Sequence, residues 1–186
     1  MSVGHYLEHV RRDFKLWKIN MDKSRNIRKF LVKEDENFLL RAGTAEDLKA
    51  IEHLHFSLFR GPIINWLQWV YKFRAPELMS VIVDKSINKV IGYDLYMFNE
   101  SELKDRYIHE QYLGIDPNYQ GKSLSVSLRK FSIECYNFGV LQGVSTLANL
   151  DDIKAIRSAQ KAGFAIKKLS AKPRAHYMVY PLTLYR

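Results

Sequence analysis

Segment 113–125 has the residue types and the spacing of a site for a phosphate group. It runs from an apolar strand through Asp116 into the start of a helix. The first turn of a helix presents unpaired backbone N–H groups and the positive end of the helix dipole, which together bind anions. The small residues Gly121, Ser123 and Ser125 let a phosphate approach the backbone. Any strand-to-helix turn can be rich in Gly and Ser, so this loop alone is a weak signal.

His109 is the best candidate for acid–base chemistry near this loop, because it lies on the strand that leads into it. Histidine ordinarily titrates near pH 6.5, so a neutral imidazole can accept a proton under physiological conditions. The alternative is that His109 only forms a hydrogen bond on a half-buried face of the sheet. Glu110 is a weaker candidate for the same role, and it should face the opposite side of the strand.

The hydrophobic patterning predicts the elements that position these residues. Strands are expected at 38–42, 80–84, 90–98, 107–115, 140–148, 164–169 and 176–185. Helices are expected at 5–19, from Thr44 to Leu58, around 66–73 before Pro76, at 123–138 and at 152–162. Three antiparallel strands followed by a strand-helix-strand unit predict an α/β (α+β) fold, with a mixed, mostly antiparallel sheet and helices on both faces.

The same loop resembles the acyl-CoA motif of the GNAT N-acetyltransferase superfamily. Ile115, Pro117 and Gln120 match that motif at its spacing. Downstream, Ile153 to Phe164 resembles the family's second motif, a helix that ends in Gly-Phe. With the order of the strands, the resemblance covers about residues 38–185, and the joint match is more specific than either motif.

The resemblance implies that acetyl-CoA is the acyl donor and that a small-molecule, peptide or protein amine is the acceptor, with no metal. In this family the loop binds the pyrophosphate of coenzyme A and a splayed strand beside it receives the pantetheine. The cofactor-binding residues implied in this way are Leu113, Ile115, Gln120, Gly121, Lys122, Ser123, Leu124 and Ser125.

Several positions depart from the family pattern. Ser123 and Ser125 stand where glycine or alanine is usual, and their hydroxyls either donate to the phosphate or crowd it. Ala159 stands where many members carry a tyrosine that protonates the departing thiolate. Tyr136 and Tyr177 are conceivable substitutes. A non-catalytic acyl-CoA-binding or regulatory module of the same fold is therefore the alternative function.

Residues 38–186 are interpreted as the GNAT domain and residues 1–37 as an extension that packs on it. Leu7, Val10, Phe14 and Trp17 recur at helical spacing in the extension. This pattern predicts an amphipathic helix. A helix that binds a partner or a membrane surface is the functional alternative.

Aromatic residues of the second helix can either wall an acceptor pocket or fill the core. The spacing of Trp66, Trp69 and Phe73 favours the core for most of them. His53 and His55 are two apart on a helix and should face different sides, which argues against a paired metal site.

The net charge of +9 comes from 29 Lys and Arg against 20 Asp and Glu, and it is concentrated after Asp152. Residues 153–186 hold eight basic and no acidic side chains. Steering of coenzyme A explains part of this charge. Binding to nucleic acid is not favoured, because the basic residues follow no known recognition motif.

Other features of the composition narrow the class of protein. The chain is 47% hydrophobic and 26% charged, which excludes disordered, collagen-like and coiled-coil chains. Cys135 is the single cysteine, so no intrachain disulfide can form, and its place on an apolar helical stripe indicates a buried side chain. No apolar run is long enough to span a bilayer, and a cytoplasmic protein is expected. A homodimer is possible.

Overall fold

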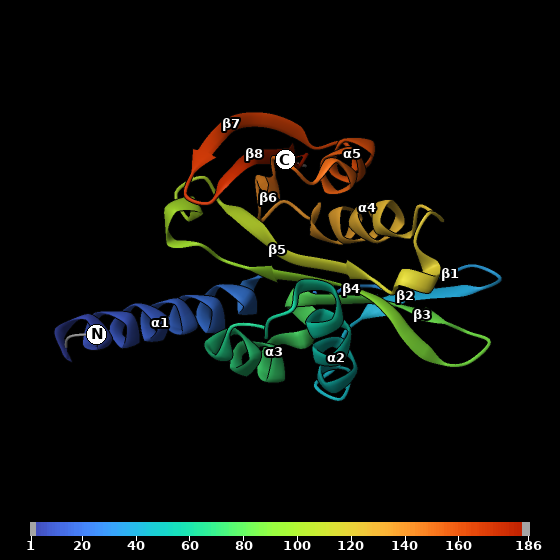
Figure 1. The fold of residues 1–186 in the computed structure, drawn as a ribbon, viewed down its shortest axis with the longest axis horizontal. Helices are drawn as coiled ribbons and strands as arrows, with labels where there is room; N and C mark the ends of the chain where they lie inside the picture. The colour runs from blue at the N-terminus through green and yellow to red at the C-terminus, as the bar shows by residue number, and fades with distance from the viewer. Residues whose placement is uncertain (1–2, 184–186) are drawn as a thin grey trace.

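The computed structural model describes residues 3–183, and its strands form one sheet (Figure 1). The strands are β1 (Lys33–Glu34), β2 (Phe38–Ala42), β3 (Met79–Asp84), β4 (Lys89–Met97), β5 (Tyr107–Ile115), β6 (Gly143–Asn149), β7 (Ala165–Ala171) and β8 (Arg174–Pro181). Across the sheet they lie in the order β1, β2, β3, β4, β5, β6, β8, β7. Neighbours are antiparallel except β5 and β6, which are parallel.

The helices cover both faces of this sheet, as Figure 1 shows. They are α1 (Val3–Lys23), α2 (Leu48–Phe59), α3 (Asn65–Leu78), α4 (Leu124–Tyr136) and α5 (Ile153–Ala162), with short 3₁₀ turns η1 (Ser24–Asn26), η2 (Glu100–Glu102) and η3 (Pro117–Tyr119). Helices α2 and α3 lie on one face, and α4 and α5 lie on the other. The predicted mixed, mostly antiparallel sheet with helices on both faces is confirmed. The expected strand 176–185 ends at Pro181, and its residues 184 and 185 lie outside the described part of the chain.

Local signals in the sequence explain why the helices next to the site begin and end where they do. The Asp47 carboxylate accepts from the Thr44 backbone N–H at 2.8 Å just before α2. The Asp152 carboxylate accepts from the Ala155 N–H at 2.9 Å at the start of α5, and Gly163 ends that helix with φ of 103°. A side-chain oxygen that accepts from a first-turn N–H group, as that of Asp152 does, stabilises the start of a helix, and glycine tolerates the left-handed conformation at helix ends.

Helix α3 differs from the sequence prediction in length, because it continues past Pro76 to Leu78. The backbone leaves helical geometry at Arg74, with φ of −127°, so α3 is two helical segments joined by a kink. Pro76 lies in the first turn of the second segment, where a missing N–H costs no hydrogen bond.

The prediction that most aromatic residues of α3 are buried is wrong for Trp69 and Phe73, which are 55% and 60% exposed. Trp66 is partly buried against the core and Tyr71 is fully buried, as predicted, and Tyr71 shares the buried face of α3 with Leu67 and Val70. Phe138 is also exposed, although it continues the apolar spacing of α4, because the helix ends at Tyr136.

The N-terminal helix α1 is longer than expected and is attached near its C-terminal end. The buried Asn20 side chain accepts from the Phe98 N–H at 2.7 Å and donates to the Phe98 carbonyl at 3.0 Å. Toward the N-terminus, Leu7, Val10 and Phe14 remain exposed. The apolar stripe predicted for this helix is thus only partly covered.

Candidate active site

Strands β5 and β6 are paired over only part of their length. Residues Tyr107 to Glu110 of β5 lie opposite residues Gly143 to Thr146 of β6. Beyond these pairs β5 remains bonded to β4, and β6 remains bonded to β8. The edges that β5 and β6 turn toward each other are therefore free of strand pairing from Gln111 onward. An extended ligand can bind such an edge as an added strand does.

A β-bulge lies at the point where the two strands separate. Leu95 of β4 is opposite Tyr112, whereas the next residue, Tyr96, is opposite Glu110. Gln111 is consequently the extra residue on β5. Bulges re-aim the groups around them and interrupt the ladder, and they are common next to active sites.

The loop after β5 presents backbone donors to solvent. Gly121 and Ser123 have φ of 83° and 59°, so the chain turns sharply before α4 begins at Leu124. Across residues 3–183 no hydrogen-bond acceptor is found for the backbone N–H groups of residues 121–125. A Cβ added at Gly121 would meet nothing within 4 Å. These five donors, with the positive end of α4, form a site suited to a pyrophosphate.

Contacts on the strand side hold this loop in place. Asp116 accepts from the Asn118 N–H at 3.0 Å and pairs with Lys89 at 3.0 Å. The Tyr119 hydroxyl donates to Asp84 at 2.7 Å, and the Gln120 side chain donates to the Ile115 carbonyl at 3.3 Å. Lys122, the cation within the loop, lies 5.1 Å from the centre of the Tyr119 ring. The donors of the loop are thus ordered before any ligand binds.

The two serines that depart from the family pattern differ in their contacts. The Ser125 hydroxyl is hydrogen-bonded to Ser158 of α5 at 2.8 Å, so it ties α4 to α5. Ser123 is exposed and adopts the left-handed conformation, which glycine adopts with less strain.

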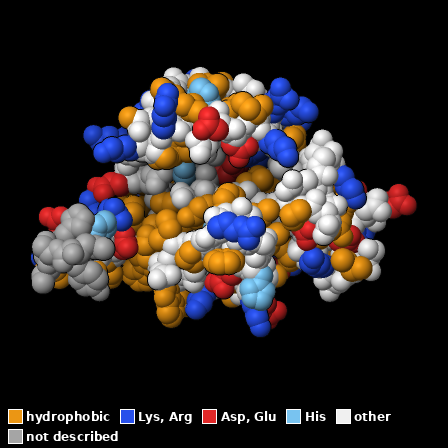
Figure 2. Space-filling model, viewed as in Figure 1, with side chains coloured by type: hydrophobic (Ala, Val, Ile, Leu, Met, Phe, Trp, Pro, Cys, Tyr) orange, Lys and Arg blue, Asp and Glu red, His pale blue; other side chains and the backbone are white. Residues whose placement is uncertain are grey.

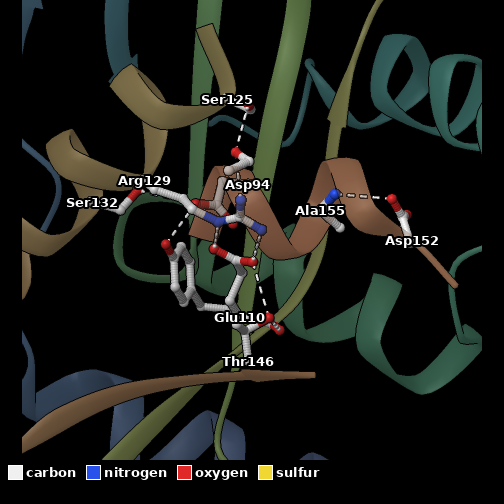
Figure 3. Close-up of polar contacts among 10 residues, drawn as sticks. Asp94, Glu110, Ser125, Arg129, Ser132, Thr146, Asp152 and Ala155 are labelled. Carbon is white, nitrogen blue, oxygen red and sulfur yellow. Dashed lines mark hydrogen bonds and ion pairs between the residues drawn. The ribbon is translucent and has the colours of Figure 1, made fainter. Parts of the chain in front are cut away.

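A buried ion pair connects α4 to the base of the two separating strands (Figure 3). Arg129 of α4 donates to both oxygens of Glu110, from Nη2 at 2.7 Å and from Nε at 2.8 Å. Thr146 of β6 also donates to Glu110 at 3.0 Å, and Arg129 Nη1 donates to Ser158 at 2.7 Å. Burial opposes the charged form of Arg129, but Glu110 raises the pKa of its guanidinium above the ordinary value.

Glu110 lies on the face of β5 that α4 covers, and both of its carboxylate oxygens accept hydrogen bonds in this network. Asp94 lies beside the pair and is fully buried, and the Tyr96 hydroxyl donates to its Oδ2 at 2.5 Å. Burial, with the charge of Glu110 nearby, raises the pKa of the Asp94 carboxyl well above its usual range. The cluster holds α4, β5 and β6 together.

His109 lies on the opposite face of β5 and is almost fully buried. Its Nδ1 is 2.8 Å from the Ser145 hydroxyl of β6 and 3.5 Å from the Glu102 carboxylate of η2. Both contacts use Nδ1, and no partner for Nε2 is found in the described part of the chain. Nε2 is therefore the ring nitrogen left for a ligand.

Glu102, which no sequence motif predicts, is the carboxylate that accepts the most hydrogen bonds on this face. The Tyr177 hydroxyl donates to it at 2.6 Å, and the Asn99 side chain donates at 2.8 Å. Burial alone would raise the pKa of the Glu102 carboxyl, but its interactions with His109, Ser145 and Tyr177 lower the pKa to about 2. No motif marks Glu102 in the sequence, because the 3₁₀ turn that carries it meets His109 only in the folded chain.

This lowered pKa predicts an acid-sensitive contribution of Glu102 to stability. The folded-state pKa of about 2 lies below the ordinary 4.5, so the contribution is complete above pH 4.5 and is lost as the pH falls toward 2. The shift corresponds to about 3 kcal/mol. Denaturant unfolding should show that Glu102→Gln is less stable than the unsubstituted protein near neutral pH, with a difference that shrinks below pH 4.5. A stability difference between the two proteins that stays constant down to pH 2 would contradict this prediction.

The other chemical candidates lie away from His109 or are engaged in the core. The Tyr136 hydroxyl donates to the Glu77 carbonyl at 2.9 Å inside the core, and Ala159 is fully buried. His53 is exposed and His55 is buried, as their spacing predicted. Cys135 is buried, and burial raises the pKa of its thiol. Within residues 3–183 no group of three His, Cys, Asp or Glu side chains is arranged to hold a metal ion.

Figure 2 shows one side of the molecule, where hydrophobic side chains gather along a hollow between its upper and lower parts. Tyr112 follows the bulge on the same face of β5 as His109 and contacts His55 of α2, with ring centroids 4.6 Å apart.

None of the helices in the described part of the chain is both long and apolar enough to cross a membrane.

Comparison with solved structures identifies this arrangement of strands and helices. Ard1 from Thermoplasma volcanium superposes with a TM-score of 0.65 at 15% identity, over 79% of this chain and 99% of its own. The NatC complex bound to Gag peptide and CoA gives a TM-score of 0.68 at 15% identity, over 79% and 99%. A GNAT-family acetyltransferase from Streptococcus pneumoniae gives 0.61 at 13%, over 78% and 99%. The chain has the GNAT acetyltransferase fold.

No protein-family model matches the sequence, and no curated protein matches it. At identities of 13 to 15% the likeness establishes the GNAT fold.

Proposed function

We propose that this protein transfers an acetyl group from acetyl-CoA to a primary amine, which attacks the thioester directly in a ternary complex. One observation carries the proposal: an unpaired strand edge from Gln111 onward leads to a loop with five free N–H groups at residues 121–125. A pyrophosphate and a pantetheine arm need these two features side by side. The complex of NatC with CoA, which has the same fold, supports the assignment of the donor.

The chain's own residues divide the work between the two faces of β5. On the α4 face, the donors of residues 121–125 hold the diphosphate, with Lys122 close by, and Leu113 and Ile115 line the strand edge. On the other face, the amine approaches His109, whose Nε2 accepts the proton that the amine loses. Acetyl-CoA supplies the activated thioester, and free N–H groups near the bulge polarise its carbonyl. General-base catalysis of this kind contributes roughly 10² to 10⁴-fold.

Thiol release from acetyl-CoA, measured with a panel of amines, tests the proposal. The panel should contain small amines, polyamines, amino sugars and peptides with free N-termini, and mass spectrometry should detect the acetylated product. We expect release of CoA with at least one acceptor class. Tight CoA binding without turnover on any amine would instead favour an acyl-CoA-binding module, the candidate favoured by Ala159 in place of a tyrosine hydroxyl.

The basic residues of α5 should steer the donor toward this site. Lys154, Arg157 and Lys161 are exposed and recur at helical spacing, and α5 packs against α4. Replacing all three with glutamine should weaken CoA binding severalfold at low salt and flatten its dependence on ionic strength. Isothermal titration calorimetry at two salt concentrations measures both effects.

A matched control replaces three exposed lysines with glutamine on the other helices, Lys18, Lys49 and Lys72. This variant has the same net charge but should bind CoA almost as the unsubstituted protein does. Equal losses in the two triple variants would mean that only the total charge matters.

A further inference from the structure

Four buried or half-buried side chains from four separate elements are linked by contacts around the imidazole of His109, and together they form the His109 cluster. They are His109 of β5, Glu102 of η2, Ser145 of β6 and Tyr177 of β8. Glu102 and His109 are 6% and 4% exposed, so solvent contributes little to their hydrogen bonding. Inside a protein, each donor and acceptor of such a cluster must therefore find its partner among the others.

The contacts at Nδ1 of His109 favour one position for the proton of the neutral ring. The Glu102 carboxylate can only accept, and Tyr177 and Asn99 both donate to it. The Ser145 hydroxyl lies 2.8 Å from Nδ1 and can either donate to the ring or accept from it. With the proton of the neutral ring on Nδ1, the ring donates toward the Ser145 oxygen and the Glu102 carboxylate. A lone pair on Nδ1 would face a carboxylate 3.5 Å away, which is repulsive.

We infer that Glu102 is a positioning residue: with Ser145 it keeps His109 in the tautomer protonated at Nδ1 and leaves the lone pair on Nε2. The assignment of the tautomer stands on the contacts alone. Its use in catalysis, where Nε2 takes the proton of the attacking amine, rests on the proposed function. Glu102 touches neither donor nor acceptor in this account and acts through His109.

Other titratable or charged side chains lie around the His109 cluster on the surrounding elements. Tyr107 of β5 acts on Tyr177 electrostatically, and Lys168 of β7 lies 5.1 Å from the centre of the Tyr177 ring. Glu100, on the same turn as Glu102, is exposed and paired with Lys15 of α1. Among these, Glu102 is the charge in direct contact with the imidazole.

Nitrogen NMR of the full chain with ¹⁵N-labelled histidine tests the inference without any turnover. His109 is assigned by loss of its signals in His109→Gln. At neutral pH we expect the Nδ1 signal to be that of a protonated nitrogen and the Nε2 signal to be that of a lone-pair nitrogen. In Glu102→Gln the two signals should move toward each other as the tautomers mix. Glu77→Gln, at another buried glutamate, is the control and should leave the His109 signals in place.

Steady-state kinetics of the same variants, measured with the amine acceptor that the panel identifies, give a second test. Glu102→Gln should lower kcat by about a hundredfold, since a wrong histidine tautomer costs up to about 10⁴-fold in Ser-His-Asp triads. The Michaelis constant for acetyl-CoA should stay within about twofold, and the acid limb of the pH–rate profile should move to lower pH. If Glu102→Gln does not fold, Ser145→Ala removes the intermediate hydroxyl and carries both measurements.

The outcomes separate this inference from the proposed function. His109 signals in Glu102→Gln that match those of the unsubstituted protein would overturn the inference, even if the enzyme is active. The expected signals in a protein that acetylates no amine would support the positioning role and contradict the proposed function. A fall in kcat with the same acid limb and unmixed tautomers would mean that Glu102 is only structural.

Discussion

Replacing His109 with glutamine should lower kcat for acetyl transfer by about 10² to 10⁴-fold, the range for loss of a general base. Glutamine keeps a polar side chain opposite Ser145 but cannot take a proton. The donor site lies on the loop and the other face of β5, so affinity for CoA should change by less than about threefold. Steady-state thiol release across pH, with calorimetric CoA binding, measures both effects.

The control for this prediction is His53→Gln, which changes an exposed histidine on α2. It should leave the rate and the pH profile as they are. An unchanged rate in His109→Gln at every pH would remove His109 from the mechanism. The proton would then have to leave through another group or through water.

Arg129→Met should lower the free energy of unfolding by about 3 to 5 kcal/mol, the cost of leaving a buried carboxylate without its partner. Glu110 would lose both hydrogen bonds from the guanidinium and keep only that of Thr146. Asp94 would lose the favourable effect of the Arg129 charge on its carboxylate. A fall in Tm of about 10 °C is expected for a domain of this size.

The double variant Arg129→Met/Glu110→Leu tests the cause of that loss. It removes both charges, so it should recover part of the stability lost by Arg129→Met alone. Lys130→Met, at the exposed neighbour on α4, should change stability by less than about 1 kcal/mol. If Arg129→Met is as stable as Lys130→Met, the ion pair is not what holds α4 on β5 and β6.

The elements around the site could be predicted because each has a local signal. β-branched and aromatic runs predicted strands β2 to β5, and β2 and β5 begin and end at the predicted residues. Asp152 and Gly163 predicted the limits of α5. The loop was found from its small residues and from the change of period after Pro117. Which residues bind coenzyme A stays a prediction, as does the division of the chain at residue 37.

The misassigned aromatic residues of α3 show where spacing alone fails. Trp66, Trp69 and Phe73 form one apolar stripe, and Leu67, Val70 and Tyr71 form a second stripe beside it. Both stripes have helical spacing, so the pattern does not tell which one faces the sheet. Only the tertiary packing, which buries Leu67, Val70 and Tyr71 fully, makes that choice.

The polar partners of the site could not be predicted for a different reason. Glu102, Ser145 and Tyr177 are up to 75 residues apart in the chain and come together only because β5, β6 and β8 are neighbours. The same holds for Arg129 and Ser158, which reach Glu110 and Ser125 from different helices. Motifs mark residues that act through the backbone of one segment, and they leave out side chains that meet across the fold.

A crystal structure of the protein soaked with acetyl-CoA is the most direct test of the proposed site. We predict that the pyrophosphate will bind against the N–H groups of residues 121–125 and that the pantetheine will lie along the free edge of β5. The thioester should then lie beside the bulge at Gln111, on the way to Nε2 of His109. Coenzyme A bound at another surface, or no binding at concentrations that saturate GNAT acetyltransferases, would contradict it.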